Sequence, residues 1–329
     1  MESPSLPLSA ALFLMLGAAA RFGSAAGLEL AATIPMPAVK GRIDHLAADV
    51  QGRRLFVAAL GNNTVEVLDV ERNRHVKSLA GFNEPQGVLY VPQTNRLYVA
   101  NGNGGRVDIL NAASLLPIKR IEELDDADNV RYDAARHTVI VGYGKGALRI
   151  LQAGSGESAG DVRLEGHPEA FQLERKGPRV LINVPDARQI AVVDRGKQIT
   201  VAAWNVPAAR NFPMALDEEG RRLFVGARSP AVMLVYDADS GKVVAKAKIG
   251  ADTDDLFFDA VRKRIYVICG AGRLDVFRQE SPDRYIKEDS VKTAPRARTG
   301  LFVPEDEKLY VAAPAAGSSP ARVLVYRVR

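Results

Sequence analysis

A unit of about 42 residues recurs along the chain and constrains its fold more than any other feature. Each copy has an apolar strand, a short turn rich in charge or glycine, and a second strand that ends in small residues. A polar turn, a third strand and a fourth follow. The copies begin 41 to 44 residues apart, at Leu46, Val88, Val130, Phe171, Met214, Leu256 and Gly300. Four short strands repeated seven times predict an all-β, seven-bladed β-propeller with four-stranded blades.

The residue types within the copies also favour strands. Residues 54–58 form a β-branched and aromatic run bounded by turns, and residues 64–68 alternate with a period near two. Residues 237–242 form a strong turn, because Asp and Ser bond their own backbone and Gly permits positive φ. The single cysteine, Cys269, cannot form an intrachain disulfide, so we expect it in the core as a small hydrophobe.

The end of the repeat predicts how the ring closes. The seventh unit has strands near residues 301–303, 309–313 and 322–328, and it lacks a fourth. Residues 28–34 form an extra strand ahead of the first unit. We expect this N-terminal strand to complete the last blade, which would remove open sheet edges.

The repeats resemble a known group, the secreted bacterial seven-bladed propellers of the YVTN-repeat, or YncE-like, family. Leu97-Tyr98-Val99-Ala100-Asn101 carries the resemblance, because it is close to the YVTN core of that family. Supporting copies lie at residues 55–58, 223–226, 236–242 and 309–312. The resemblance covers residues 27–329 and implies a seven-bladed fold, an exported location and a binding or interaction role without an assigned reaction. The third and fourth units lack the aromatic residue, so no functional residue is transferred.

The N-terminal segment predicts export. Residues 6–20 are mostly Leu, Ala, Phe and Met, about the length of a signal-peptide core. Ser24 and Ala26 fit the small-x-small cleavage rule. We therefore expect residues 1–26 to be a signal peptide and residues 27–329 to be one propeller domain in the periplasm or outside the cell. An uncleaved anchor is the alternative, although the apolar segment is short for that role.

Composition narrows the classes of partner. The chain has 44 Lys and Arg against 39 Asp and Glu, with both signs mixed and no basic stripe with interleaved aromatics. Nucleic acid is therefore not expected as a partner. No run reaches the ~18–20 apolar residues of a membrane-spanning helix, so no span is expected after signal cleavage. We expect a monomer whose partner is a small molecule or a periplasmic protein.

The repeat register predicts a polar site at one end of the central channel. The loop that enters the innermost strand of each blade should lie on the same face as the loop between the second and third strands. Equivalent positions there carry carboxylates in four of the seven blades, and an arginine in the seventh. Turn chemistry explains each residue singly, but their collection favours a ligand site. The candidate ligand-binding residues are Asp44, His45, Gln86, Asp128, Asn129, Glu169, Asp254, Asp255 and Arg298.

Other residues on this face could complete the site. Converging carboxylates need a metal, a proton or an arginine to offset their repulsion. Ca²⁺, which takes six to eight oxygens, is one candidate cofactor, although nearby arginines make a metal optional. The candidate neutralising residues are Arg42, Arg210, Arg296 and Arg298. The loops between second and third strands add Asn62, Asn63, Asn101, Asn103, Tyr143, Lys145, Arg188 and Arg228.

The four histidines do not suggest a three-histidine zinc site. His45 and His167 should lie on the candidate face, but three blades apart, so shared ligation of one metal is not expected. His75 and His137 should lie in solvated turns on the opposite face. A second set of carboxylates recurs three residues into each first strand and should begin the following turn. These structural carboxylates are Asp49, Asp133, Glu174, Asp217 and Asp259.

Nothing specific in the sequence supports an electron-transfer or dehydrogenase subunit partner, as in quinoprotein propellers, and two other classes of function remain open. The first is an exported, non-enzymatic propeller that binds a small molecule or protein at the channel mouth. The alternative is a metal-assisted hydrolase or lyase of the lactonase or streptogramin-lyase type, with His45 as general base. A fold alone does not choose between them.

Overall fold

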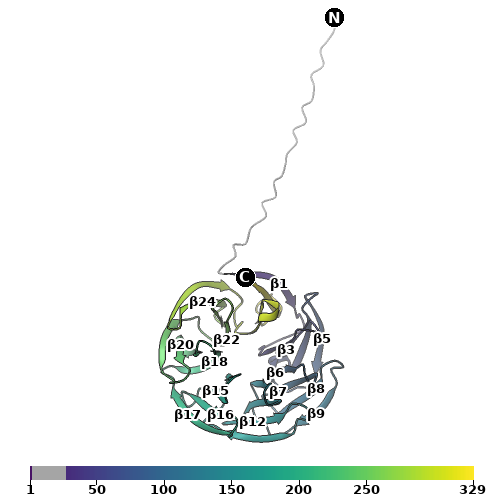
Figure 1. Ribbon diagram of the computed structural model, residues 1–329. Helices are drawn as coiled ribbons and strands as arrows, with labels where there is room; N and C mark the ends of the chain where they lie inside the picture. Colours follow the sequence, from purple (N-terminus) through teal and green to yellow (C-terminus); the bar gives the residue numbers. More distant parts are fainter. Residues whose placement is uncertain (2–26) are drawn as a thin grey trace.

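The computed structural model describes residue 1 and residues 27–329. Over residues 27–329 the strands form seven antiparallel sheets of four strands each, arranged as blades around a common axis (Figure 1). In six blades the strands follow one another in chain order from the axis outward. The predicted seven-bladed β-propeller is confirmed. The predicted signal segment spans residues 1–26, of which residues 2–26 lie outside the part of the chain that the structure describes.

The first four blades contain strands β2 to β17. Blade 1 comprises β2 (Leu46–Asp49), β3 (Arg54–Ala59), β4 (Thr64–Asp69) and β5 (Arg74–Ala80), with a 3₁₀ turn at Leu60–Asn62. Blade 2 comprises β6 (Pro85–Val91), β7 (Arg96–Asn101), β8 (Arg106–Asn111) and β9 (Pro117–Ile121). Blade 3 comprises β10 (Val130–Asp133), β11 (Thr138–Tyr143), β12 (Ala147–Gln152) and β13 (Ser158–Arg163). Blade 4 comprises β14 (Phe171–Leu173), β15 (Arg179–Val184), β16 (Gln189–Asp194) and β17 (Ile199–Asn205).

The last three blades contain the remaining strands. Blade 5 comprises β18 (Ala209–Asp217), β19 (Arg222–Ser229), β20 (Ala231–Asp237) and β21 (Val243–Lys248). Blade 6 comprises β22 (Thr253–Asp259), β23 (Arg264–Cys269), β24 (Arg273–Ser281) and β25 (Arg284–Lys292). Blade 7 comprises β26 (Thr299–Val303), β27 (Lys308–Ala313), β28 (Arg322–Val328) and β1 (Leu28–Pro35), with a 3₁₀ turn at Pro304–Asp306.

Blade 7 joins the two ends of the propeller. β1 pairs antiparallel with β28, from Leu28 opposite Val328 to Pro35 opposite Arg322. The C-terminus therefore lies beside β1 (Figure 1). The N-terminal strand takes the outermost place in the blade, as its sequence position predicts.

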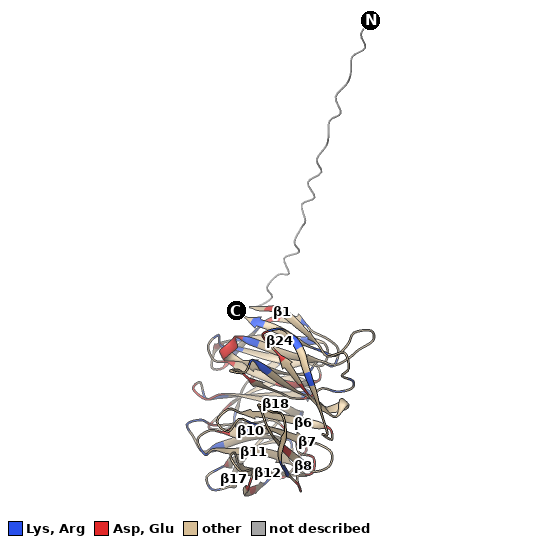
Figure 2. Cartoon of the chain, turned by 90° about the vertical axis from the view of Figure 1, so that its right-hand side faces the viewer, with Lys and Arg blue, Asp and Glu red and all other residues tan. Residues whose placement is uncertain are grey.

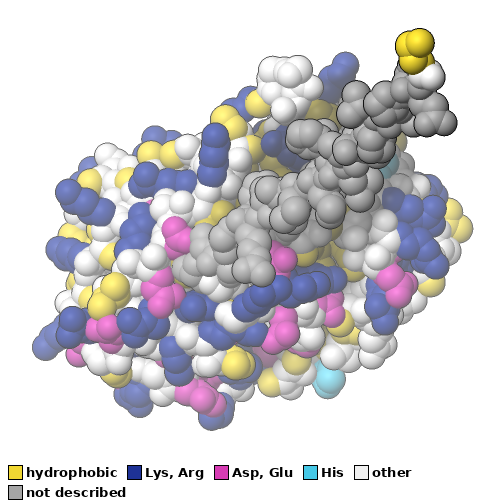
Figure 3. Space-filling view, turned by 90° about the horizontal axis from the view of Figure 1, so that it is seen from above, with side chains coloured by type: hydrophobic (Ala, Val, Ile, Leu, Met, Phe, Trp, Pro, Cys, Tyr) yellow, Lys and Arg dark blue, Asp and Glu magenta, His cyan; other side chains and the backbone are white. Residues whose placement is uncertain are grey.

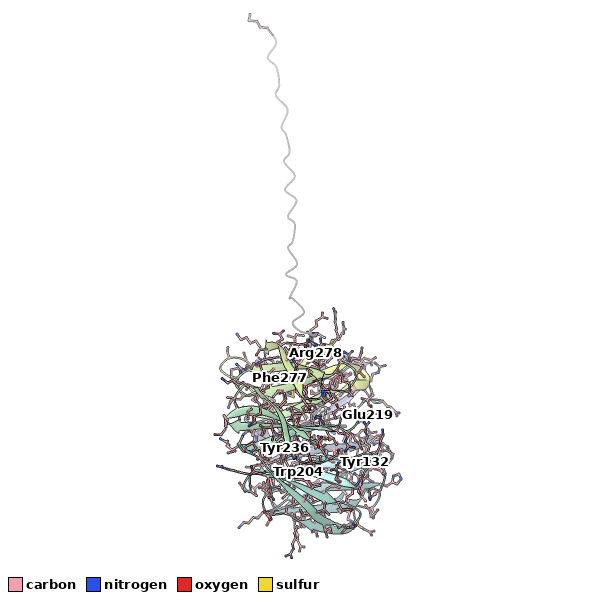
Figure 4. The ribbon with its side chains drawn as sticks, turned by 60° about the vertical axis from the view of Figure 1, so that its left-hand side comes forward. Tyr132, Trp204, Glu219, Tyr236, Phe277 and Arg278 are labelled. Atoms are coloured by element: carbon pink, nitrogen blue, oxygen red, sulfur yellow. The ribbon has the colours of Figure 1, made fainter. Side chains whose placement is uncertain are left out.

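The core consists of apolar layers between neighbouring blades. Buried tyrosines recur in the second strands, and Tyr98 donates to the carbonyl of Ala153 in the next blade at 2.9 Å. Tyr236 lies on a third strand, where it donates to the carbonyl of Asn205 at 3.2 Å and stacks on Trp204 (Figure 4). Such contacts join one blade to the next, because each hydroxyl needs a partner once its ring is buried. Cys269 is buried in this core, as expected.

The turns away from the candidate site use the carboxylates that recur in the first strands. Asp49 accepts from the amide of Gly52 at 2.8 Å, and Asp217 accepts from that of Gly220 at 2.9 Å. Their structural role is confirmed.

The prediction for His75 is wrong: this residue lies within β5, and its Nε2 is 2.7 Å from the fully buried carboxylate of Glu66. His137 does lie in an exposed turn.

Charge is distributed over the whole ring. Basic and acidic residues occur on strands and loops of many blades (Figure 2), and they are interspersed on the face seen in Figure 3. In the part of the chain that the structure describes, no helix has the length and apolarity to cross a membrane.

Candidate functional site at the channel mouth

Extended segments lead into the innermost strands and place their side chains at one end of the channel, here called the mouth. Side chains two residues apart on an extended chain point the same way. A cavity of about 370 Å³ opens among them. We call this space the mouth cavity. The residues that line it are Arg42, Gln86, Asp126, Asp128, His167, Glu169, Arg210, Phe212, Arg228, Asp254 and Arg298.

The structure brings the nine candidate residues together at this mouth. Five of them line the mouth cavity: Gln86, Asp128, Glu169, Asp254 and Arg298. The other four connect to it through side-chain contacts: Asp44, His45, Asn129 and Asp255. The register of the repeat thus identifies residues that meet in space, and ligand binding by them stays a prediction.

His45 lies at the centre of the buried part of this site. Its Nδ1 is 3.5 Å from Asp255, and its Nε2 is 3.8 Å from Asp44 and 3.9 Å from Asp128. The amide nitrogen of Asn129 is 3.3 Å from the same Nε2. One imidazole therefore faces three carboxylates whose residues are each at most 8% exposed.

These carboxylates determine the charge of His45. Burial alone would lower its pKa, but Asp255, Asp44 and Asp128 raise the pKa of His45 to about 10. The imidazole is therefore protonated at neutral pH and lacks the free lone pair of a general base. His45 also faces a second cavity of about 360 Å³ further along the channel, rather than the mouth cavity. Both observations argue against His45 as the base of a hydrolase or lyase.

Arginines and carboxylates pair on the side of the mouth formed by blades 5 to 7. Arg228 binds Asp254, and its guanidinium lies 4.1 Å over the ring of Phe212. Arg298 reaches Asp254 at 2.8 Å and Asp252 at 3.1 Å. Burial raises the pKa of Asp254, although both arginines oppose the shift. These contacts hold the two guanidiniums in fixed positions.

Blades 3 and 4 form a second, more acidic side. Asp128, His167 and Glu169 each place one potential metal ligand within 4.8 Å of the other two. Burial, together with the charge of Asp128, raises the pKa of Glu169 to about 8. Burial would lower the pKa of His167, but Asp128 and the carbonyl of Gly144 raise it to about 9. Burial would raise the pKa of Asp128, yet the two histidines lower it.

Most of the loops between second and third strands do not contribute. Of the eight residues expected from them, Arg228 alone lines the mouth cavity within the described chain. Asn63 accepts from the amide of Glu84, and the buried Asn101 accepts from that of Asn83. Their amides therefore serve the turns. Among the expected neutralising arginines, Arg296 instead donates to the carbonyl of Ala315 at 2.6 Å.

Arg42, Asp126, His167 and Arg210 lie two residues ahead of register positions and line the mouth cavity. Arg42 and Arg210 were expected here as neutralising residues and His167 was expected on the same face, whereas Asp126 was not assigned to the site from the sequence. The signal was present, because an extended lead-in repeats its direction every second residue. A period of two applied to each lead-in identifies all four. Several of these positions have positive φ, among them Asp126 and Arg210, which reflects the shared turn of the repeat.

Comparison with known proteins identifies the fold. No protein-family model and no curated protein sequence matches the chain. A chain of the "Crystal Structure of Mitotic Checkpoint Complex" has a TM-score of 0.78 at 16% identity, over 100% of this chain and 99% of that chain. A chain of Kuenenia stuttgartiensis hydrazine synthase has a TM-score of 0.76 at 15% identity, over 88% of this chain and 97% of that chain. Such likeness establishes the seven-bladed β-propeller fold.

Proposed function

We propose that this chain is an exported propeller of the YVTN-repeat type that binds a small molecule with an anionic group at its mouth. The observation that carries this proposal is the convergence of side chains from all seven blades around one polar cavity. Among the eleven residues of the described ring that line the cavity, only Phe212 is apolar. An apolar ligand would therefore leave charged groups unpaired.

Unused hydrogen-bond donors favour an anion. Four arginines and His167 line the cavity, against four carboxylates. Arg210 makes no ion pair with any residue of 27–329, and Nη2 of Arg298 lacks an acceptor there, since its bonds to Asp252 and Asp254 use Nη1 and Nε. A guanidinium with free N–H groups binds carboxylate or phosphate oxygens well. Asp252 and Asp254 hold Arg298 in position before a ligand arrives.

Calorimetric titration tests the anion site. Inorganic phosphate, succinate and glutamate serve as probes, with the mature chain in EDTA. We expect at least one probe to bind, and Arg210→Ala and Arg298→Ala to weaken it about 10- to 100-fold each, because a hydrogen bond to a charged group contributes about 1.5–3 kcal/mol. Arg72→Ala, an exposed arginine in the turn between β4 and β5, is the matched control and should bind normally. Failure of all three probes at millimolar concentration would contradict the proposal.

Export has a separate test. The apolar segment and the small residues before Gly27 support signal cleavage after Ala26. Mass spectrometry of the secreted or periplasmic chain should therefore find Gly27 as its first residue. A full-length chain that sediments with membranes would instead establish the uncleaved anchor.

A further inference from the structure

We infer that Asp128, His167 and Glu169 bind one divalent first-row transition-metal ion at the mouth. The inference rests on the proposed function only in that both place a ligand in the same cavity. The three side chains come from the lead-ins to β10 and β14, the innermost strands of neighbouring blades. Their potential ligand atoms lie within 4.8 Å of one another. Bonds of about 2.1 Å to a tetrahedral ion would bring such atoms to about 3.4 Å apart, a small closure for side chains on loops.

The orientation of His167 favours a metal. Its Nδ1 lies 2.7 Å from the carbonyl oxygen of Gly144, and a carbonyl only accepts, so Nδ1 carries the proton. Nε2 is therefore the nitrogen that a metal ion would bind in place of a proton, and it faces Asp128 at 4.0 Å. Metal-binding histidines are usually held in this way, with the other ring nitrogen donating to a carbonyl or carboxylate. The backbone thus presets the ligand atom.

Asp128 provides an independent indication. The residue is 7% exposed and lines the mouth cavity, yet its Oδ1 accepts no hydrogen bond from any described residue. Oδ1 lies 3.9 Å from Nε2 of His45, beyond hydrogen-bond distance, and Oδ2 lies on the side of His167, 4.0 Å from its Nε2. Leaving a buried carboxylate without a bond is costly. A cation bound between Asp128, His167 and Glu169 would offset the negative charge of this buried carboxylate.

The donor set indicates the class of metal. One imidazole nitrogen with two carboxylates suits zinc, manganese, iron or cobalt, whereas Ca²⁺ prefers oxygen ligands alone. Three protein ligands also leave a coordination position open toward the cavity. Arg210 and Arg298 line that same cavity. An anionic ligand could therefore contact the metal with one oxygen and an arginine with another.

The test is metal titration of the full mature chain after EDTA treatment, with no organic ligand present. We expect one Zn²⁺ per chain, and one Co²⁺ with visible ligand-field absorption that reports nitrogen coordination. His167→Ala and Glu169→Gln should each weaken binding at least 10-fold, since even the loss of an outer partner costs about 10- to 100-fold. Glu165→Gln, at an exposed position of the same loop, and His137→Asn in a distant turn are matched controls and should bind normally.

Each result decides the inference. Absence of stoichiometric Zn²⁺ and Co²⁺, or retention of full affinity in folded His167→Ala and Glu169→Gln, would overturn it. Binding of Ca²⁺ alone would also overturn it, in favour of an all-oxygen site. Circular dichroism in EDTA verifies that both variants fold, and Glu169→Gln keeps the test decisive if His167→Ala does not. Anion binding in EDTA is measured separately, so failure of the metal site and failure of the anion site are distinguishable.

Discussion

Deleting residues 27–36 should leave little soluble, folded protein. This change removes β1 and the buried side chains of Leu28, Ile34 and Met36, each at most 3% exposed. Full burial of each contributes about 1.5–3 kcal/mol, so the sum is comparable with a total stability of about 5–15 kcal/mol. The loss also exposes the edge of β28, which invites aggregation. Soluble yield and thermal melting of chains that begin at residue 27 or at residue 37 measure the effect.

Single substitutions within β1 distinguish the effect of ring closure from the effect of shortening the chain. Ile34→Ala should destabilise the fold by about 2–5 kcal/mol, because Ile34 is fully buried. Leu30→Ala is the matched control, since Leu30 is 53% exposed on the same strand. A shortened chain that melts like the intact chain would show that β1 does not close the ring.

Replacing His45 by leucine should destabilise the protein by about 3–5 kcal/mol at pH 6, since it leaves Asp44, Asp128 and Asp255 without their shared cation. The pKa of His45 is about 10 in the folded protein, above its ordinary value of 6.5. Its contribution is therefore present in full below pH 6.5 and is lost as the pH rises toward 10. Urea unfolding at several pH values, in metal-free buffer, measures it.

The pH dependence identifies the cause of this effect. The difference in unfolding free energy between the native chain and His45→Leu should shrink steadily from pH 6.5 to 10. A difference that stays constant with pH would indicate lost packing rather than lost charge. His137→Asn is the matched control, because His137 is exposed in a turn, and its stability should follow that of the native chain.

The fold could be predicted almost completely from the sequence, because repetition compensates for ambiguity in any one strand. The copies at Leu46 and Val88 repeat the same strand and turn chemistry, and the position of β1 predicts the closing partner of β28. His75 could not be placed, because its neighbour Glu66 lies on another strand and strand pairing is needed to bring them together.

The site could be predicted only in part. The repeat places equivalent residues of different blades at the same height along the channel axis, and this identifies Asp128 and Glu169. It does not say how far each side chain reaches, and so the approach of His167 to Asp128 and Glu169 was not predicted. The ion pairs of Arg228 with Asp252 and Asp254 depend on side-chain reach across a blade boundary. Which ligand the site can bind depends on these distances between side chains, and the residue types alone do not give them.

The pairing of β1 with β28 also determines when the last blade can form during folding. Leu28 and Val328 are among the first and last residues of the described chain, yet they are direct partners. Contacts so distant in sequence form late and slowly, because the intervening chain must be ordered first. Six blades can assemble from local hairpins during synthesis, but the seventh waits for the final strand. An emerging chain is therefore an open arc with two unsatisfied edges, and its exposure to chaperones, proteases and other copies ends only when the last residues arrive.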